Sequence, residues 1–362
     1  MHSELKQTKT SIKLRQSLLR LALAFVLGTS LALAGCQTGN SNSNGGNGNS
    51  GSTGNSSNGS VKPDTPLPVR VASLKGPTSI GLVNFMEQEK TNPDATPLGA
   101  YEFKIYGTAD EILPLFVSGE IDIALVSANI AAVLYNRTTG GVVAININTL
   151  GVLYVVGADD SISSLNDLKG RTVLMTGKGT TPDYVMSYLL AAQGLDGQVT
   201  LEFKSEATEL AAAINADPTA IALLPEPYVT AVCSKNPNLS PRISLTDEWQ
   251  SVQPSGKLVT GVTVVSRDFL GKHPDVVDEF IAAQADSVVL ANTTTANTAE
   301  LVVQYGIIDS ASVATEAIPR CNLVCIVGTE LQSSLGAYLE VLYKADPESI
   351  GGILPTADFY YY

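Results

Sequence analysis

The feature that most constrains this sequence is a repeated alternation of short apolar runs with segments of helical periodicity. Val69–Leu74 is the first run; a Gly-Pro-Thr-Ser break follows at residues 76–79, and residues 80–86 then carry apolar side chains at helical spacing. The same order recurs at Phe103–Tyr106 and Ile121–Val126. Because strand, loop and helix in repetition build βαβ units, we predict an α/β fold with mostly parallel sheets.

Local signals indicate where the first helices begin. Thr78 or Ser79 is available to cap the first helix, and Thr108 and Glu111 have the spacing of a capping box. Ser127 opens the next expected helix in the same way. We therefore expect hydroxyl side chains at several helix N-termini.

The alternation falls into two blocks, which predicts two lobes with a ligand cleft between them. It restarts after Val152, and the strand expected at Val259–Val265 precedes a mainly helical C-terminal region. The chain would cross between the lobes near Leu150–Leu153 and return near Val259–Thr263. We assign residues 67–152 and 260–362 to lobe 1 and residues 153–259 to lobe 2.

The N-terminal region, residues 1–36, has the pattern of a lipoprotein signal peptide. Basic residues between Lys6 and Arg20 precede the apolar run Leu21–Ala34, which is typical of a secretory signal rather than a spanning helix. The ending Leu-Ala-Gly-Cys resembles the bacterial lipobox, which implies that Cys36 is acylated and becomes the mature N-terminus. A plain secretory signal with an incidental cysteine is the alternative. Residues 37–66 are rich in Gly, Asn and Ser and predict a disordered tether.

Composition narrows the classes of partner. The formal net charge of −13 disfavours nucleic acid. After Cys36 the chain has only Cys233, Cys321 and Cys325, which cannot make a full disulfide framework. The apolar neighbours of Cys321 and Cys325 predict two buried thiols in a strand. The roles of all three thiols stay open.

The sequence lacks the residues of common catalytic and metal sites. Its only histidines are His2, in the signal region, and His273, so no Ser–His–Asp triad, Cys–His pair or His-based metal site can be built. Gly177–Gly179 is too short for a dinucleotide fingerprint. We therefore predict a protein that is not an enzyme and that has neither cofactor nor metal.

Three strings of residues indicate a family. They are F-V-S-G-E-I-D-I-A-L at 116–125, S-S-L-N-D-L-K-G-R-T-V at 163–173 and V-V-S-R-D-F-L-G-K-H-P-D-V-V-D-E-F at 264–280. In this order they resemble the type II periplasmic solute-binding fold of ABC transporters. Within it they are most similar to the group that binds nitrate, alkanesulfonates, taurine or thiamine-pyrimidine precursors. The likeness spans Val69 to about Tyr343.

The resemblance implies a ligand held between the lobes by loops at the carboxyl ends of strands and by helix N-termini. Five loops match these positions. Each has small or hydroxyl residues before a helix, where free N–H groups and the positive dipole end suit a polar ligand. The alternative is that these residues only cap their helices. The predicted ligand-binding residues are Gly76, Pro77, Thr78, Ser79, Tyr106, Gly107, Thr108, Ser127, Ala128, Asn129, Gly179, Thr180, Thr181, Glu226, Pro227 and Tyr228.

Charged and aromatic candidates are few. Lys75 or Lys178 is placed to pair with an anionic group, and Glu226 to accept from an amine, although each is also expected as a solvated surface charge. No arginine occupies a candidate loop, which disfavours a rigid bidentate clamp on a carboxylate or phosphonate. The aromatic candidates for stacking are Tyr106, Tyr154, Tyr228 and Trp249, the last equally expected as surface packing.

Together these features predict the extracytoplasmic solute-binding component of an ABC importer. It would capture a small organic or oxyanion solute by closure of its two lobes and deliver it to a membrane permease with its ATPase. Cys36 would anchor a monomer to the outer face of the cell membrane. A ligand-sensing or surface interaction lipoprotein on the same scaffold, without a transporter, is the alternative.

We expect Cys36→Ser to release the protein into the medium or to abolish its processing, because the acylated thiol is lost. Cell fractionation and the mass of the mature protein measure these outcomes. Unchanged membrane retention together with an unchanged mass would contradict the anchor assignment.

Overall fold

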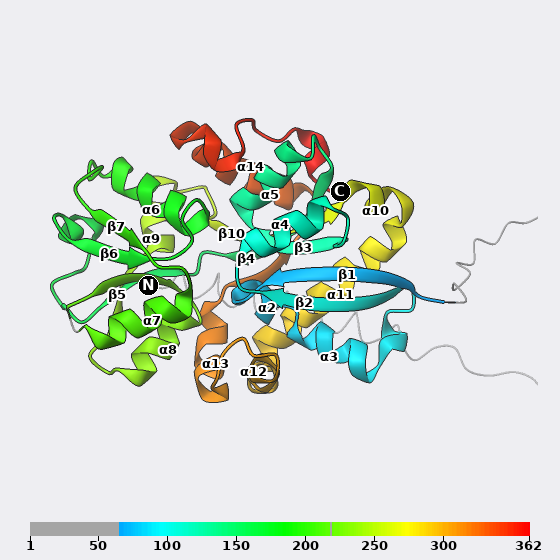
Figure 1. The fold of residues 1–362 in the computed structure, drawn as a ribbon, viewed down its shortest axis with the longest axis horizontal. Helices are drawn as coiled ribbons and strands as arrows, with labels where there is room; N and C mark the ends of the chain where they lie inside the picture. Colours follow the sequence, from blue (N-terminus) through cyan, green and yellow to red (C-terminus); the bar gives the residue numbers. More distant parts are fainter. Residues whose placement is uncertain (1–64, 218) are drawn as a thin grey trace, which may run out of the picture. The chain divides into compact units, whose positions relative to one another are not determined.

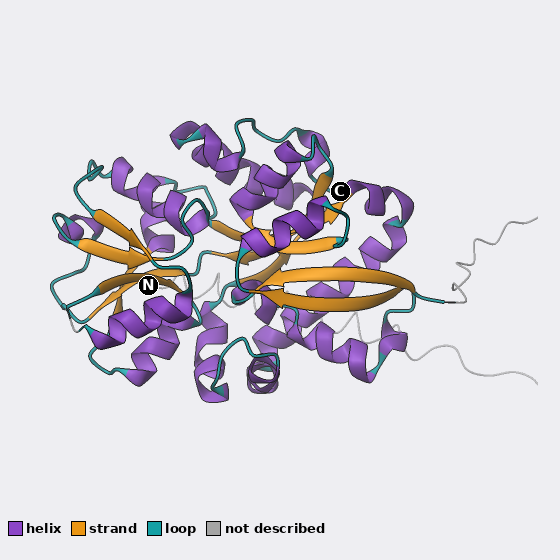
Figure 2. Cartoon of the chain, viewed as in Figure 1, coloured by secondary structure: helices purple, strands orange, loops and turns teal. Residues whose placement is uncertain are grey.

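The computed structural model describes residues 65–217 and 219–362 as an α/β fold with two separate sheets (Figures 1 and 2). The predicted signal peptide, Cys36 and residues 37–64 of the predicted tether lie outside these described residues. The two-lobed fold expected from the sequence is confirmed. We call the larger sheet with its packed helices the six-stranded lobe, and the smaller sheet with its packed helices the five-stranded lobe.

The strands of the larger sheet are β1 (Leu67–Leu74), β2 (Gly99–Tyr106), β3 (Ile123–Ser127), β4 (Val142–Leu150), β10 (Val259–Ser266) and β11 (Leu323–Ile326). They lie in the order β11-β4-β10-β3-β1-β2. β1 is parallel to β2 and β3, whereas β10 is antiparallel to β3 and β4, and β11 is antiparallel to β4. Three parallel strands therefore end at one side of this sheet.

The strands of the smaller sheet are β5 (Leu153–Gly157), β6 (Thr172–Met175), β7 (Thr200–Phe203), β8 (Ile221–Pro225) and β9 (Ser240–Ser244). They lie in the order β7-β6-β8-β5-β9. β6 is parallel to β7 and β8, and β5 is antiparallel to β8 and β9.

Both sheets are mixed, so the prediction of mostly parallel sheets is wrong. Five of the nine pairings between these strands are antiparallel. The reason is the double crossing of the chain: β5 enters the five-stranded sheet, and β10 enters the six-stranded sheet, from the side where the neighbouring parallel strands end.

The two crossings lie next to each other. β4 ends at Leu150 and β5 begins at Leu153, while Val259, the first residue of β10, pairs with Leu150. The chain thus leaves and re-enters the six-stranded sheet at adjacent positions. The lobe boundaries assigned from the sequence stay a prediction.

Helices cover the two sheets. None in residues 65–217 and 219–362 is both long enough and apolar enough to cross a membrane. The α-helices are α2 (Pro77–Ile80), α3 (Val83–Thr91), α4 (Ala109–Val117), α5 (Ala128–Arg137), α6 (Thr181–Ala192), α7 (Ala207–Ala216), α8 (Tyr228–Lys235), α9 (Leu245–Val252), α10 (Arg267–Lys272), α11 (Pro274–Thr293), α12 (Thr295–Gln304), α13 (Ala311–Ala317) and α14 (Gly328–Ala345). The short 3-10 helices are η1 (Pro93–Ala95), η2 (Leu165–Leu168), η3 (Ile318–Arg320), η4 (Pro347–Ile350) and η5 (Ala357–Phe359).

Trp249 is a core residue, so the alternative of surface packing is wrong. Its side chain on α9 is 1% exposed, and its ring centroid lies 5.4 Å from the rings of Tyr188 on α6 and Tyr338 on α14. Leu245 and Trp249, four residues apart, form the buried face of α9, while the polar neighbours of Trp249 lie on the other face. α14 also packs on β4 and α5 of the six-stranded lobe, so this aromatic cluster lies where the lobes meet.

The three cysteines of the described residues are free thiols. Cys321 is buried but follows η3 rather than lying in a strand, and Cys325 in β11 is only partly buried. The prediction of two buried strand thiols is therefore wrong in part. Burial raises the pKa of the Cys321 thiol far above its ordinary value, which makes it unreactive.

Trp249→Ala should lower the free energy of unfolding by about 3–5 kcal/mol, since it removes a large buried ring. Trp249→Phe should cost less, because the indole N–H has no hydrogen-bond partner within the described chain. Urea denaturation followed by circular dichroism measures both. The control is Val117→Ala, at a side chain 60% exposed, with an expected change within about 0.5 kcal/mol. Equal effects of Trp249→Ala and Val117→Ala would refute this packing role.

Candidate functional site

The predicted loops of the six-stranded lobe share one edge of its sheet. β1, β2 and β3 are parallel, and each is followed by one of these loops. Leu74 pairs with Tyr106, and the next residue, Lys75, donates its N–H to the Tyr106 carbonyl over 2.8 Å. In the other lobe β8 ends where β5 begins, with Pro225 paired to Leu153. Loops from both lobes therefore flank the crossings.

Asn129 and Thr181 bring two of the predicted loops into direct contact. The Thr181 hydroxyl at the start of α6 donates to Asn129 Oδ1 over 3.3 Å, and Asn129 Nδ2 donates to the Gly179 carbonyl over 3.3 Å. Both side chains are fully buried. The N-termini of α5 and α6 thus meet across the lobes. Asn129 Nδ2 also donates to the Ser349 carbonyl in η4 over 3.1 Å, a partner that the sequence did not indicate.

Thr78 and Ser79 do not cap α2, so that expectation is wrong. The N-cap is Gly76, whose φ of 132° suits glycine, and both hydroxyls donate back to the Leu74 carbonyl. A Cβ at Gly261, near the second crossing, would lie only 2.8 Å from Thr78 Cγ2. Thr78 is therefore packed against the returning strand, and its hydroxyl retains only acceptor capacity for a ligand.

Thr108 and Ser127 occupy N-cap positions with unused hydroxyls. Thr108 precedes α4 and Ser127 precedes α5, yet neither side chain makes a capping bond. The expected capping box is also wrong, because Glu111 accepts from the N–H of Gly107, over 3.1 Å, rather than from Thr108. Both residues are partly exposed. The alternative that these hydroxyls only cap helices is therefore not supported at these two positions.

Glu226 is held by internal partners. Its side chain is 1% exposed, and its carboxylate accepts from the Thr230 N–H at 3.2 Å, from the Thr230 hydroxyl at 2.8 Å and from Arg320 Nε at 2.9 Å. Burial raises the pKa of the Glu226 carboxyl, while Thr230 and Arg320 oppose that shift. Arg320 is the charged residue that sequence reasoning missed. It lies 94 residues from Glu226, and no local pattern links the two.

The remaining candidate residues differ in their exposure to solvent and in the contacts they already make. Lys75 and Lys178 are exposed, and Lys178 Nζ lies 5.7 Å from the centre of the Phe203 ring. The Thr180 hydroxyl donates to the Gly177 carbonyl over 2.7 Å. Tyr154 is half-buried, and burial together with the nearby Glu226 raises the pKa of its hydroxyl. Gly179 and Gly107 are exposed, whereas Ala128, Pro227 and Tyr228 are buried.

Two hollows in the surface are lined by other residues. One, of about 570 Å³, lies beside β2 and α3; the other, of about 840 Å³, lies between α6 and α14. Neither is lined by a predicted ligand-binding residue. Among residues 65–217 and 219–362, no three His, Cys, Asp or Glu side chains are grouped as a metal site would require.

The groups at the candidate site suit a polar ligand. Helix N-termini, hydroxyls and amides from both lobes lie at the crossings, and such groups bind an anion or a neutral polar molecule without a metal. His273 packs on Phe269, with ring centroids 5.2 Å apart, at the far end of β10 from these loops.

The chain is similar to known proteins in sequence and in fold. A family model of the phosphonate periplasmic substrate-binding proteins of ABC transporters matches residues 95–269. An ABC transporter protein from Parabacteroides distasonis has 24% identity and a TM-score of 0.68, covering 83% of this chain and 99% of its own. The periplasmic aliphatic sulphonate-binding protein of Escherichia coli has 16% identity and a TM-score of 0.62, covering 77% of this chain and 88% of its own.

A third structure, the alkanesulfonate-binding protein of Xanthomonas axonopodis pv. citri bound to MOPS, has 14% identity and a TM-score of 0.62. It covers 81% of this chain and 96% of its own. No curated protein sequence matches. The matched family consists of solute-binding proteins rather than enzymes. The resemblance predicted from the sequence is therefore confirmed: residues 95–269 match a family of periplasmic substrate-binding proteins of ABC transporters, and the fold is similar to that of solved ABC solute-binding proteins.

Proposed function

We propose that the chain binds a small tetrahedral oxyanion, a sulfonate or a phosphonate, between its lobes for import. The observation that carries this proposal is the pair of uncommitted hydroxyls, Thr108 and Ser127, at the N-termini of α4 and α5. Positive helix ends and free hydroxyl donors favour an anion. The family model and two of the similar structures carry phosphonate or sulphonate in their names, which supports the same class.

An amine-type ligand has less support. Glu226 is the only acidic side chain among the candidates, and its carboxylate already accepts bonds from Thr230 and Arg320. A ligand amine would have to displace these partners. Recognition through Glu226, as with a pyrimidine amine, is therefore the second candidate.

The cellular role follows from the family. We propose delivery of the solute to a membrane permease and its ATPase, by a monomer anchored through acylated Cys36 and the tether at residues 37–66. No catalysis is proposed. Solute uptake measured in cells with and without this gene separates this role from a ligand-sensing lipoprotein: uptake that needs this chain supports import, and binding without uptake supports sensing.

The ligand class is tested by thermal shift of the mature domain with methanesulfonate, methylphosphonate, nitrate and a pyrimidine. A ligand at a hundred times its dissociation constant adds about 2.7 kcal/mol of stability. We expect stabilisation by methanesulfonate or methylphosphonate. Stabilisation by the pyrimidine alone would favour recognition through Glu226.

Thr108→Ala and Ser127→Ala should each weaken binding of the stabilising anion about 5- to 150-fold, since each removes a donor worth about 1–3 kcal/mol. Neither should disturb the fold, because these hydroxyls make no capping bond. Isothermal titration measures the affinity. Ser118→Ala, at the other end of α4, is the matched control and should bind as the wild type does. Unchanged affinity in both test variants would place the site elsewhere.

A further inference from the structure

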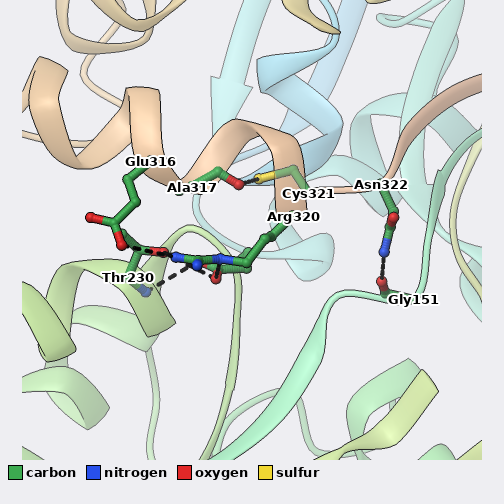
Figure 3. A network of polar contacts seen from close by, with 8 residues as sticks. Gly151, Thr230, Glu316, Ala317, Arg320, Cys321 and Asn322 are labelled. Atoms are coloured by element: carbon green, nitrogen blue, oxygen red, sulfur yellow. Dashed lines mark hydrogen bonds and ion pairs between the residues drawn. The ribbon is translucent and has the colours of Figure 1, made fainter. Parts of the chain in front are cut away.

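The segment Ile318–Asn322 makes contacts in two directions (Figure 3). It joins α13, which lies against α8 of the five-stranded lobe, to β11, the edge strand of the six-stranded sheet. Within it, Arg320 and Asn322 are only two positions apart. We call Ile318–Asn322 the connecting segment.

Arg320 binds a buried carboxylate in a predicted ligand loop of the five-stranded lobe. Its Nε donates to Glu226 Oε1 over 2.9 Å, and its Nη2 donates to the Thr230 hydroxyl in α8. Since Glu226 is 1% exposed, loss of the guanidinium would leave a buried carboxylate bonded to Thr230 alone among its partners described above. The other ion pair of Arg320, with Glu316 on α13, is an exposed pair of small expected effect.

Asn322 fastens the same segment to the first crossing. Its Nδ2 donates to the Gly151 carbonyl, and its own carbonyl accepts from the Leu150 N–H over 3.1 Å. The backbone of Asn322 has a φ of 45°, a left-handed conformation that Asn adopts more readily than most residues. Both the side chain and the backbone of Asn322 therefore bind the first crossing.

The first crossing, at Gly151, also packs closely against residues other than Asn322. A Cβ on Gly151 would lie 2.2 Å from Thr246 Oγ1 and 3.1 Å from Leu258 Cδ2. Between the two anchoring side chains, Cys321 is fully buried, which ties the connecting segment to the core. Arg320 and Asn322 therefore have little freedom to move independently of each other.

We propose that Arg320 is a positioning residue that sets the orientation of the two lobes. Through its ion pair with Glu226, Arg320 fixes the predicted ligand loop of the five-stranded lobe. Asn322, in the same connecting segment, binds the first crossing at Gly151, so the loop and the crossing are held relative to each other. Loss of either anchor allows the five-stranded lobe to rotate about the crossings. If the binding-competent orientation is populated less, apparent affinity falls by the same fraction. The effect on affinity rests on the proposed solute binding, whereas the effect on orientation does not.

The orientation is measured first, without ligand, by small-angle X-ray scattering of the mature domain. We expect Arg320→Met and Asn322→Gly to increase the radius of gyration relative to the wild type. Asn322→Gly keeps the left-handed backbone accessible and removes only the amide bond to Gly151, so it provides the test if Arg320→Met does not fold. The control is Arg171→Met, which removes an arginine of similar exposure from its pair with Asp159 inside the five-stranded lobe, where the carboxylate is 39% exposed rather than buried.

Affinity for methanesulfonate and methylphosphonate is measured second. Arg320→Met and Glu226→Gln should each weaken binding about 5- to 30-fold, as expected if the competent orientation falls to roughly 3–20% of molecules. The double variant should bind no more weakly than the worse single variant, because Arg320 acts through Glu226. Arg320→Lys, which keeps the charge, should recover part of the loss.

The outcomes separate the two proposals. Unchanged scattering for both Arg320→Met and Asn322→Gly would overturn the positioning role, and so would losses that multiply in the double variant. Changed scattering in a protein that binds neither anion would support the positioning role and reject the oxyanion class. A change in Arg171→Met equal to that in Arg320→Met would show that any lost ion pair loosens the domain, and would also overturn the proposal.

Discussion

The pairing of β4 with β10 is the constraint on which the rest of the structure depends. These strands carry the chain out of and back into the six-stranded sheet, and Val259 lies beside Leu150 where they leave it. Two adjacent connections form a narrow bridge between lobes. The same arrangement makes β5 and β10 antiparallel to strands beside them, and it places the carboxyl ends of β3 and β8 near the bridge.

The polar side chains around this bridge are of two kinds, those that bind to other parts of the fold and those that make no capping bond. Glu226 and Arg320 are bound to each other, and Asn129 is bound to Thr181, so these side chains connect parts of the fold. The hydroxyls of Thr108 and Ser127 make no capping bond at the N-termini of their helices. Recognition is therefore assigned to hydroxyls and helix ends, whereas the ion pair of Glu226 with Arg320 is assigned to holding the lobes.

Local periodicity was sufficient to predict the α/β fold, the first strands and the loops after them. It failed where a residue's partner lies far along the chain. β4 was not predicted, because Asn146 and Asn148 interrupt its apolar pattern. Both amides are buried; Asn146 bonds to Gln284 and Thr263, 138 and 117 residues away, and Asn148 also bonds to Thr263. The pair of Glu226 with Arg320 escaped prediction for the same reason. The hydroxyls of Thr78 and Ser79 donate to the Leu74 carbonyl instead of accepting from helix N–H groups as an N-cap would.

The position of Trp249 has a further consequence. It is the only tryptophan of the chain, and its indole is enclosed between Tyr188 and Tyr338, on helices α6 and α14. Because α14 also packs on the six-stranded lobe, any movement of one lobe against the other changes the surroundings of this ring. The intrinsic fluorescence of the unlabelled protein should therefore change when one lobe moves against the other.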